Sequence, residues 1–115
     1  MSSIERIGTT ARWSDIVIHN QTVYLVEVPS QLDADITGQA HEVLASLEAL
    51  LKQAGSDKSR ILSATIYLKD ISEIAAFNAV WDAWLPSGSA PVRACVQAVM
   101  ADPGYRVEIQ LTAAR

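Results

Sequence analysis

Three residues near the C-terminus combine chemical reactivity with stretches that are otherwise apolar: Arg93, Cys95 and Glu108. The first two lie in the alternating stretch 92–100, and Glu108 lies in the alternating stretch 105–112. A guanidinium can hold a carboxylate through two hydrogen bonds, and a carboxylate can accept a proton and return it. Since a charge within an apolar strand is unfavourable unless it is paired or used, these residues are candidates for a functional site.

The turn between the two stretches decides whether these three side chains share one face of a sheet. Residues 101–104, Ala-Asp-Pro-Gly, are typical of a turn, so the region predicts a β-hairpin. A four-residue loop places Met100 opposite Tyr105, and the three side chains then face the same way. A three-residue loop shifts the register by one residue and separates them. The predicted site therefore depends on the four-residue loop.

Length and composition limit the classes of protein. A length of 115 residues predicts one domain, residues 1–115. Half of the residues are hydrophobic and the net charge of the chain is −4, which predicts a folded, soluble, mildly acidic protein. The sequence offers no candidate membrane span or signal peptide, and one cysteine fits a reducing compartment, so we expect a cytoplasmic protein. The acidic balance disfavours nucleic acid. His19 and His41 lack metal-ligand spacing, and we expect neither metal nor cofactor.

Strand-like and helix-like stretches alternate along the chain. Strands are predicted over 4–7, 15–19, 22–28, 61–68, 92–100 and 105–112, and helices over 36–54 and 72–84. Asn20-Gln21 predicts a tight hairpin turn, and Asp33 or Asp35 can cap the first helix. In that helix an apolar stripe excludes Gln39, which is expected to lie away from it. In the strand 61–68, Leu62 is expected to face the same way as Ala64.

The order of these elements predicts an α+β sandwich, with one sheet and both helices on the same face. Two helices cover only one face of the sheet. The stretches 16–18, 23–26 and 96–100, however, carry apolar or small residues on both faces. We therefore expect a second copy of the chain to cover the other face.

The sequence resembles the RidA family (the YjgF-type reactive-intermediate deaminases) over nearly its whole length. The similar segments are residues 12–15, 66–71 and 77–81 and, above all, 90–96 (Ala-Pro-Val-Arg-Ala-Cys-Val) with 107–109 (Val-Glu-Ile). The Ala-Arg-Trp-Ser start and the Ala-Pro-Val-Arg segment are most similar to a short, YoaB-like branch. The resemblance implies a chorismate-mutase-like fold with one mixed sheet, assembled as a homotrimer with its sites between subunits.

The activity implied by the resemblance is the hydrolysis of 2-imino acids, such as 2-iminopropanoate, to 2-oxo acids and ammonia. The family positions imply that Arg93 binds the substrate carboxylate and that Glu108 positions or activates the attacking water. They also imply that Cys95 and Asn78 line the same pocket. This chemistry agrees with the residue types, because one carboxylate can take a proton from water and return it to the leaving ammonia.

Two positions differ from the family pattern. Trp13 stands where many members have a tyrosine, and Leu25-Val26-Glu27 stands where a Ser-Gly-Gln type of turn is usual. The resemblance places Trp13 with the substrate and Glu27 at the pocket rim. A carboxylate there would narrow the range of substrates, because it repels the anionic end of a small imino acid. The strand pattern offers an alternative, in which Glu27 points to solvent at the end of its strand.

Each candidate residue also has a structural interpretation. Arg93 can be an ion-pair partner, Glu108 a solvent-facing strand residue, and Asn78 a partner for backbone groups. Cys95 is interpreted as a small packed hydrophobe rather than a nucleophile. At the level of function, the alternative to a deaminase is a non-catalytic small-molecule-binding or regulatory trimer that keeps the Arg93 clamp.

Overall fold

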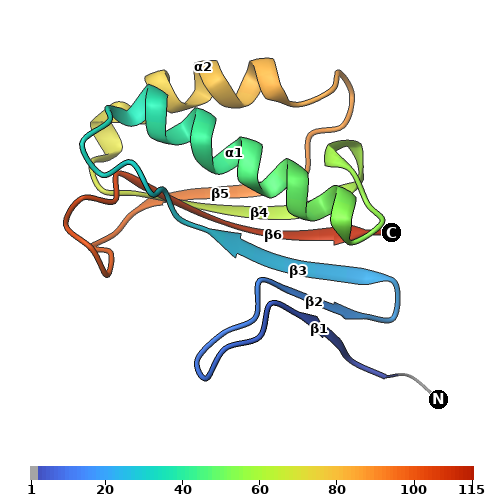
Figure 1. Cartoon of the computed structure of the whole chain (residues 1–115). Helices are drawn as coiled ribbons and strands as arrows, with labels where there is room; N and C mark the ends of the chain where they lie inside the picture. The colour runs from blue at the N-terminus through green and yellow to red at the C-terminus, as the bar shows by residue number, and fades with distance from the viewer. Residues whose placement is uncertain (1–2) are drawn as a thin grey trace.

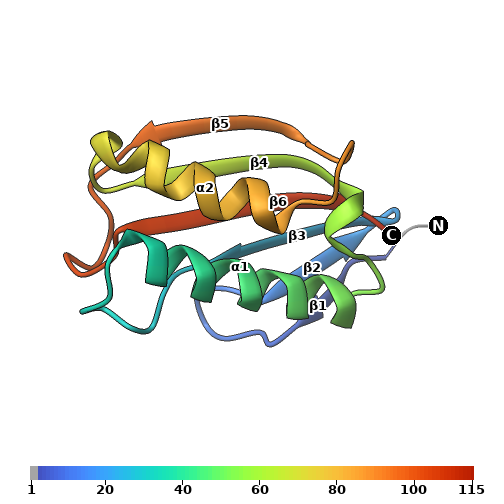
Figure 2. The same cartoon turned by 90° about the horizontal axis from the view of Figure 1, so that it is seen from above.

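Six strands form one mixed sheet in the order β1-β2-β3-β6-β4-β5 in the computed structural model, which describes residues 3–115 (Figure 1). The strands are β1 (Glu5–Ile7), β2 (Ile16–His19), β3 (Thr22–Glu27), β4 (Ile61–Leu68), β5 (Val92–Gln97) and β6 (Val107–Ala114). Both helices, α1 (Ile36–Gln53) and α2 (Ile74–Trp84), lie side by side over the same face of the sheet (Figure 2). The predicted α+β architecture is confirmed.

Local sequence signals explain where several elements begin and end. Asn20 and Gln21 both have positive φ, 52° and 63°, which is the backbone of a tight turn between β2 and β3. Asp35 caps α1, because its side chain accepts a hydrogen bond from the Gly38 N–H at 2.8 Å. Gly55, at φ +82°, follows the end of the helix and supplies the left-handed conformation there. A 3₁₀ turn, Ile71–Glu73, precedes α2, which therefore starts two residues later than predicted.

The core lies between the helices and the sheet. Every member of the predicted α1 stripe is buried: Ile36, Ala40, Val43, Leu44, Leu47, Leu51 and Ala54. The expectation for Gln39 is wrong, because this side chain is fully buried as well. The expectation for Leu62 is also wrong. An irregularity between Ile61 and Ser63 shifts the register of β4, so that Ile61 is buried and Leu62 is half exposed.

The predicted hairpin between the last two strands is wrong. Strand β4 lies between β5 and β6, parallel to β5 and antiparallel to β6. Residues 98–106 form a loop across the end of β4, where the Ala98 N–H donates to the Leu68 carbonyl and the Lys69 N–H donates to the Arg106 carbonyl. This loop is long enough to pass over one strand, and for that reason β5 ends at Gln97 rather than at Met100.

The second face of the sheet carries no helix within residues 3–115 (Figure 1). It has several large apolar side chains with substantial exposure, among them Val92 (73%), Val96 (43%), Tyr24 (43%) and Val26 (41%). No helix in this part of the chain is both long and apolar enough to cross a membrane.

Candidate functional site

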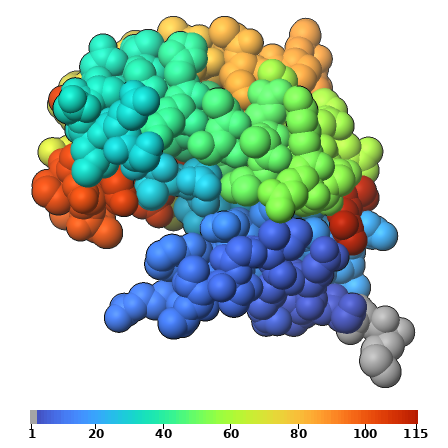
Figure 3. Space-filling model, viewed as in Figure 1, coloured from blue at the N-terminus to red at the C-terminus, as the bar shows by residue number. Residues whose placement is uncertain are grey.

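One cavity, of about 480 Å³, collects three of the sequence-predicted site residues. It lies beside the end of β3, between the loop that follows β1 and the segment 101–108, and a notch is visible there in the space-filling view (Figure 3). The lining residues are Trp13, Ser14, Asp15, Val26, Glu27, Val28, Ala101, Tyr105 and Glu108. A cavity of this size and mixed lining can hold a small organic molecule.

Glu108 enters the cavity wall from β6, the strand between β3 and β4. Its register partner on β4 is Tyr67, and the two residues on either side of Glu108, Val107 and Ile109, are fully buried under the helices. Because neighbouring side chains of a strand point to opposite faces, Glu108 lies on the face that no helix covers. It is half-buried there and lines the cavity, on the side of the sheet that faces away from the helices.

Trp13 and Asp15 reach the cavity from the loop between β1 and β2. Thr10 shapes this loop, because its N–H donates to the Trp13 carbonyl at 2.7 Å and its hydroxyl accepts from the Trp13 N–H at 3.2 Å. A Cβ on Gly8 would lie 2.0 Å from Asp15 Oδ2, so a glycine is required for Asp15 to lie where it does. The Trp13 side chain remains 60% exposed and is available to a ligand or to another chain.

Glu27 is the last residue of β3 and is among the residues that line the cavity. Burial raises the pKa of its carboxyl above the ordinary value, and the negative charges of Asp15 and Glu42 act in the same direction. The Val28 N–H, which donates to Glu27 Oε2 at 3.3 Å, opposes this shift. Glu27 therefore holds its proton more firmly than an exposed glutamate does.

The remaining predicted residues form a second group, at the junction of α2 and the edge strand β5. Arg93 Nη1 donates to Asn78 Oδ1 at 2.8 Å, and the guanidinium carbon lies 5.6 Å from the centre of the Trp81 ring. Cys95, two residues further along β5, is half-buried and packs against the core. Burial raises the pKa of the Cys95 thiol, with Arg93 opposing the shift, so this side chain suits packing better than nucleophilic attack.

A single chain does not bring Arg93 and Glu108 together. Arg93 and Cys95 align with the buried residues Ala64 and Ile66 of β4, so they face the helices. Glu108 lies on the opposite face. The shared face predicted from a hairpin register is therefore wrong, and the physical reason is the insertion of β4 between the two strands.

Sequence reasoning also missed three parts of the site. Tyr105 lines the cavity, but the pattern assigned it only to an alternating strand. Asp15 lay within a segment similar to the family, without a role of its own. Gln39, which holds the loop before Glu108, was expected on the exposed side of α1. Among residues 3–115, no group of three or more His, Cys, Asp and Glu side chains is arranged to hold a metal ion.

The chain is an α+β sandwich with an acidic and aromatic cavity and an arginine on an edge strand. These features agree with the family that its sequence matches. The chain belongs to the family described as Endoribonuclease L-PSP, whose model matches residues 3–115. The RutC family protein YoaB of Escherichia coli (strain K12) is 52% identical over 112 residues, which are 97% of this chain and 98% of that protein. The predicted membership of the RidA (YjgF-type) family, and the similarity to its YoaB-like branch, are confirmed.

Two further comparisons bear on the fold and on the function. The crystal structure of NMB1025 from Neisseria meningitidis, a member of the YjgF protein family, matches with a TM-score of 0.93 at 42% identity. The match covers 98% of this chain and 95% of that one. The 2-iminobutanoate/2-iminopropanoate deaminase of Escherichia coli (strain K12) is 29% identical over 87 residues, covering 74% of this chain and 68% of that protein.

Proposed function

We propose that this protein hydrolyses 2-imino acids to 2-oxo acids and ammonia, in sites that form between two copies of the chain. The observation that carries the proposal is the division of the candidate residues into two groups on opposite faces of one sheet. Arg93 and Asn78 form one group, and Glu108 lies in the cavity of the other. A site that uses both requires each group to come from a different chain. The name of the distant E. coli deaminase supports this reaction for the family.

The exposed face of the sheet supports assembly. Tyr24 and Val26 on β3 and Val96 on β5 are each exposed by more than 40%, and all three lie on the face of the sheet that no helix covers within residues 3–115. Covering such apolar side chains with another molecule removes them from water and is favourable. We propose a second copy of the chain as that molecule, in a homotrimer as the family resemblance implies.

Arg93 is suited to hold the carboxylate of the substrate. A guanidinium has five N–H donors, and the hydrogen bond to Asn78 uses one of them. That bond and the Trp81 ring fix the plane of the guanidinium, which leaves a pair of donors for a carboxylate. Cys95 would line this side of the pocket with an uncharged thiol.

Glu108 is suited to move protons. In the proposed reaction water adds to the carbon of the C=N bond. The C–N bond then breaks, which releases ammonia and gives a 2-oxo acid. Glu108 takes a proton from the attacking water and returns it to the departing nitrogen, so neither oxidant nor metal is required. Trp13 would cover the side chain of the substrate. Glu27 would lie at the rim of the site, where burial raises the pKa of its carboxyl.

The non-catalytic alternative is supported by the same cavity. Trp13 and Glu27 are the positions where the sequence departs from the family pattern, and both line the cavity. A binding or regulatory trimer would keep the Arg93 clamp and lose turnover. An activity on nucleic acid, as the family description names it, is disfavoured, because Asp15, Glu27 and Glu108 line the cavity and repel a polyanion.

The deciding experiment generates 2-iminopropanoate from alanine with an amino-acid oxidase and traps the surviving imine with semicarbazide. With the protein present, we expect less semicarbazone to accumulate than in a protein-free control. An Arg93→Ala variant should match the protein-free control. Equal trapping with and without the protein would exclude the deaminase and leave the binding function.

A further inference from the structure

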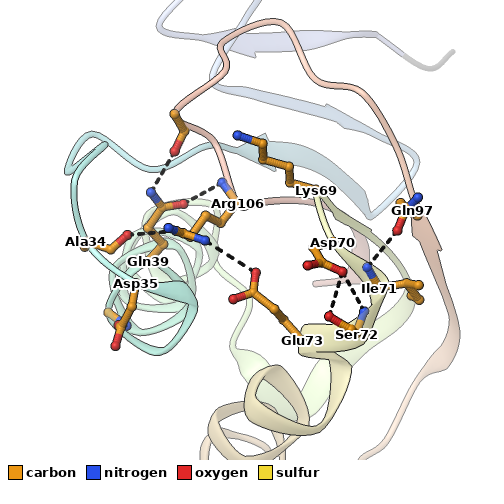
Figure 4. A network of polar contacts seen from close by, with 12 residues as sticks. Ala34, Asp35, Gln39, Lys69, Asp70, Ile71, Ser72, Glu73, Gln97 and Arg106 are labelled. Atoms are coloured by element: carbon orange, nitrogen blue, oxygen red, sulfur yellow. Dashed lines mark hydrogen bonds and ion pairs between the residues drawn. The ribbon is translucent and has the colours of Figure 1, made fainter.

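A buried amide connects the start of α1 to the loop that precedes Glu108 (Figure 4). The Gln39 side chain is fully buried. Its Nε2 donates to the carbonyls of Gly104, at 2.9 Å, and Gln31, at 3.2 Å. Its Oε1 accepts from the Arg106 N–H at 2.7 Å. Both donors and the acceptor of the amide are therefore used.

These hydrogen bonds fix the wall of the cavity. Gly104 and Arg106 are the two neighbours of Tyr105, so Gln39 holds the chain on both sides of this cavity residue. Glu108 follows Arg106 by only two residues. Close packing adds a second restraint, since a Cβ on Gly104 would lie 2.8 Å from the Leu32 Cβ.

The Arg106 side chain extends the same network to the second helix (Figure 4). Its Nε donates to the Ala34 carbonyl at 3.2 Å, and its Nη1 lies 3.6 Å from Glu73 Oε1. Glu73 directly precedes α2, which carries Asn78, the partner of Arg93. The segment before Glu108 is thus tied to the starts of both helices.

We infer that Gln39 is a positioning residue for the site, and that its amide sets where Tyr105 and Glu108 stand in the cavity wall. A buried glutamine within an apolar helix stripe is unfavourable compared with an aliphatic residue unless its hydrogen bonds are needed. Here two of the three hold the loop of residues 98–106, and that loop forms part of the cavity wall. The consequence for catalysis rests on the proposed function, whereas the consequence for the loop does not.

Amide hydrogen exchange tests the loop directly. Gln39→Met keeps the length of the side chain and removes all three hydrogen bonds. We expect exchange to become roughly tenfold faster or more over residues 104–107, with the second half of α1 unchanged. Gln53→Met makes the same chemical change at an exposed position of the same helix and should change nothing. Unchanged exchange over 104–107 in Gln39→Met would overturn the inference, whether or not the protein hydrolyses imines.

Kinetics test the link to Glu108. We expect Gln39→Met to lower kcat roughly tenfold or more with a smaller change in KM, and to lower it much less in a Glu108→Gln background. Leu47→Ala, a core truncation on α1 away from the cavity, controls for lower global stability. An equal loss of kcat in both backgrounds would show a merely structural role and overturn the inference.

A second pair of variants applies if Gln39→Met does not fold. Gly104→Ala pushes the loop away from Leu32, and Leu32→Gly in the same chain removes the Cβ that causes the collision. We expect the single variant to lose loop protection and activity, and the double variant to recover both. If Gly104→Ala left exchange over 104–107 and kcat unchanged, the cavity would not depend on the position of this loop, and the inference would be overturned.

Discussion

Replacing Arg93 with lysine tests whether this residue binds the carboxylate of a substrate or only stabilises the folded chain. Within residues 3–115, the exposed guanidinium makes one hydrogen bond, to Asn78, and one contact with the Trp81 ring. A hydrogen bond contributes about 0.5–1.5 kcal/mol and an exposed cation–π contact about 0.5–1 kcal/mol. Lysine keeps the charge and part of both contacts. We therefore expect Arg93→Lys to lower the free energy of unfolding by less than about 2 kcal/mol.

The expected loss of activity is larger than this structural effect. A lysine ammonium is a point charge and cannot form the paired hydrogen bonds of a guanidinium with a carboxylate. The loss of one charge-assisted hydrogen bond, about 1.5–3 kcal/mol, corresponds to a decrease of about 10- to 150-fold in kcat/KM. The measurement is semicarbazide trapping over a range of alanine concentrations, with urea unfolding of the same samples. Arg60→Lys, outside both groups of site residues, is the matched control. A folded Arg93→Lys protein with nearly unchanged kcat/KM would refute the assignment.

Three other changes have defined outcomes. Glu108→Gln keeps the shape of the side chain but cannot accept a proton, so kcat should fall about 100-fold or more with little change in KM; a higher KM at unchanged kcat would make Glu108 a binding residue only. Because burial raises the Glu27 pKa, the wild-type protein loses stability as pH rises from 4.5 through the raised value. Glu27→Gln should therefore be more stable than wild type in urea at pH 7, with the difference fading near pH 4, and equal stability at both pH values would contradict this. Gln21→Gly, at φ 63°, should raise the free energy of unfolding by about 1 kcal/mol, and a decrease would show that the Gln21 side chain has contacts that outweigh the strain.

Local features of the fold could be predicted from the sequence because their causes are local. The spacing of apolar residues in α1 fixes which side meets the sheet, and the cap at Asp35 and the turn at Asn20-Gln21 depend on neighbouring backbone only. The burial of Gln39 could not be predicted in this way. Its partners, Gly104 and Arg106, are distant in sequence, and without them a glutamine is expected to face solvent.

The arrangement of the site could be predicted only in part, for a related reason. The alternation of residues along β5 and β6 correctly separates the two sides of each strand. It does not say which neighbouring strand each one pairs with. That choice is set by non-local packing, and β4 takes the place between them, which puts Arg93 and Glu108 on opposite faces. The resemblance to the family named the candidate residues, and the strand order places them in two groups on opposite faces of the sheet.

Subunit mixing tests the central claim, a site shared between two chains, most directly. Arg93→Lys and Glu108→Gln proteins are each expected to have little activity. When the two are unfolded together and refolded, random pairing leaves about one site in four with both native residues. We predict that the mixture recovers about a quarter of wild-type imine hydrolysis, whereas each variant refolded alone shows no more than about a tenth of it. Mixed assemblies that are demonstrated by mass spectrometry and show no recovery of activity would contradict the account.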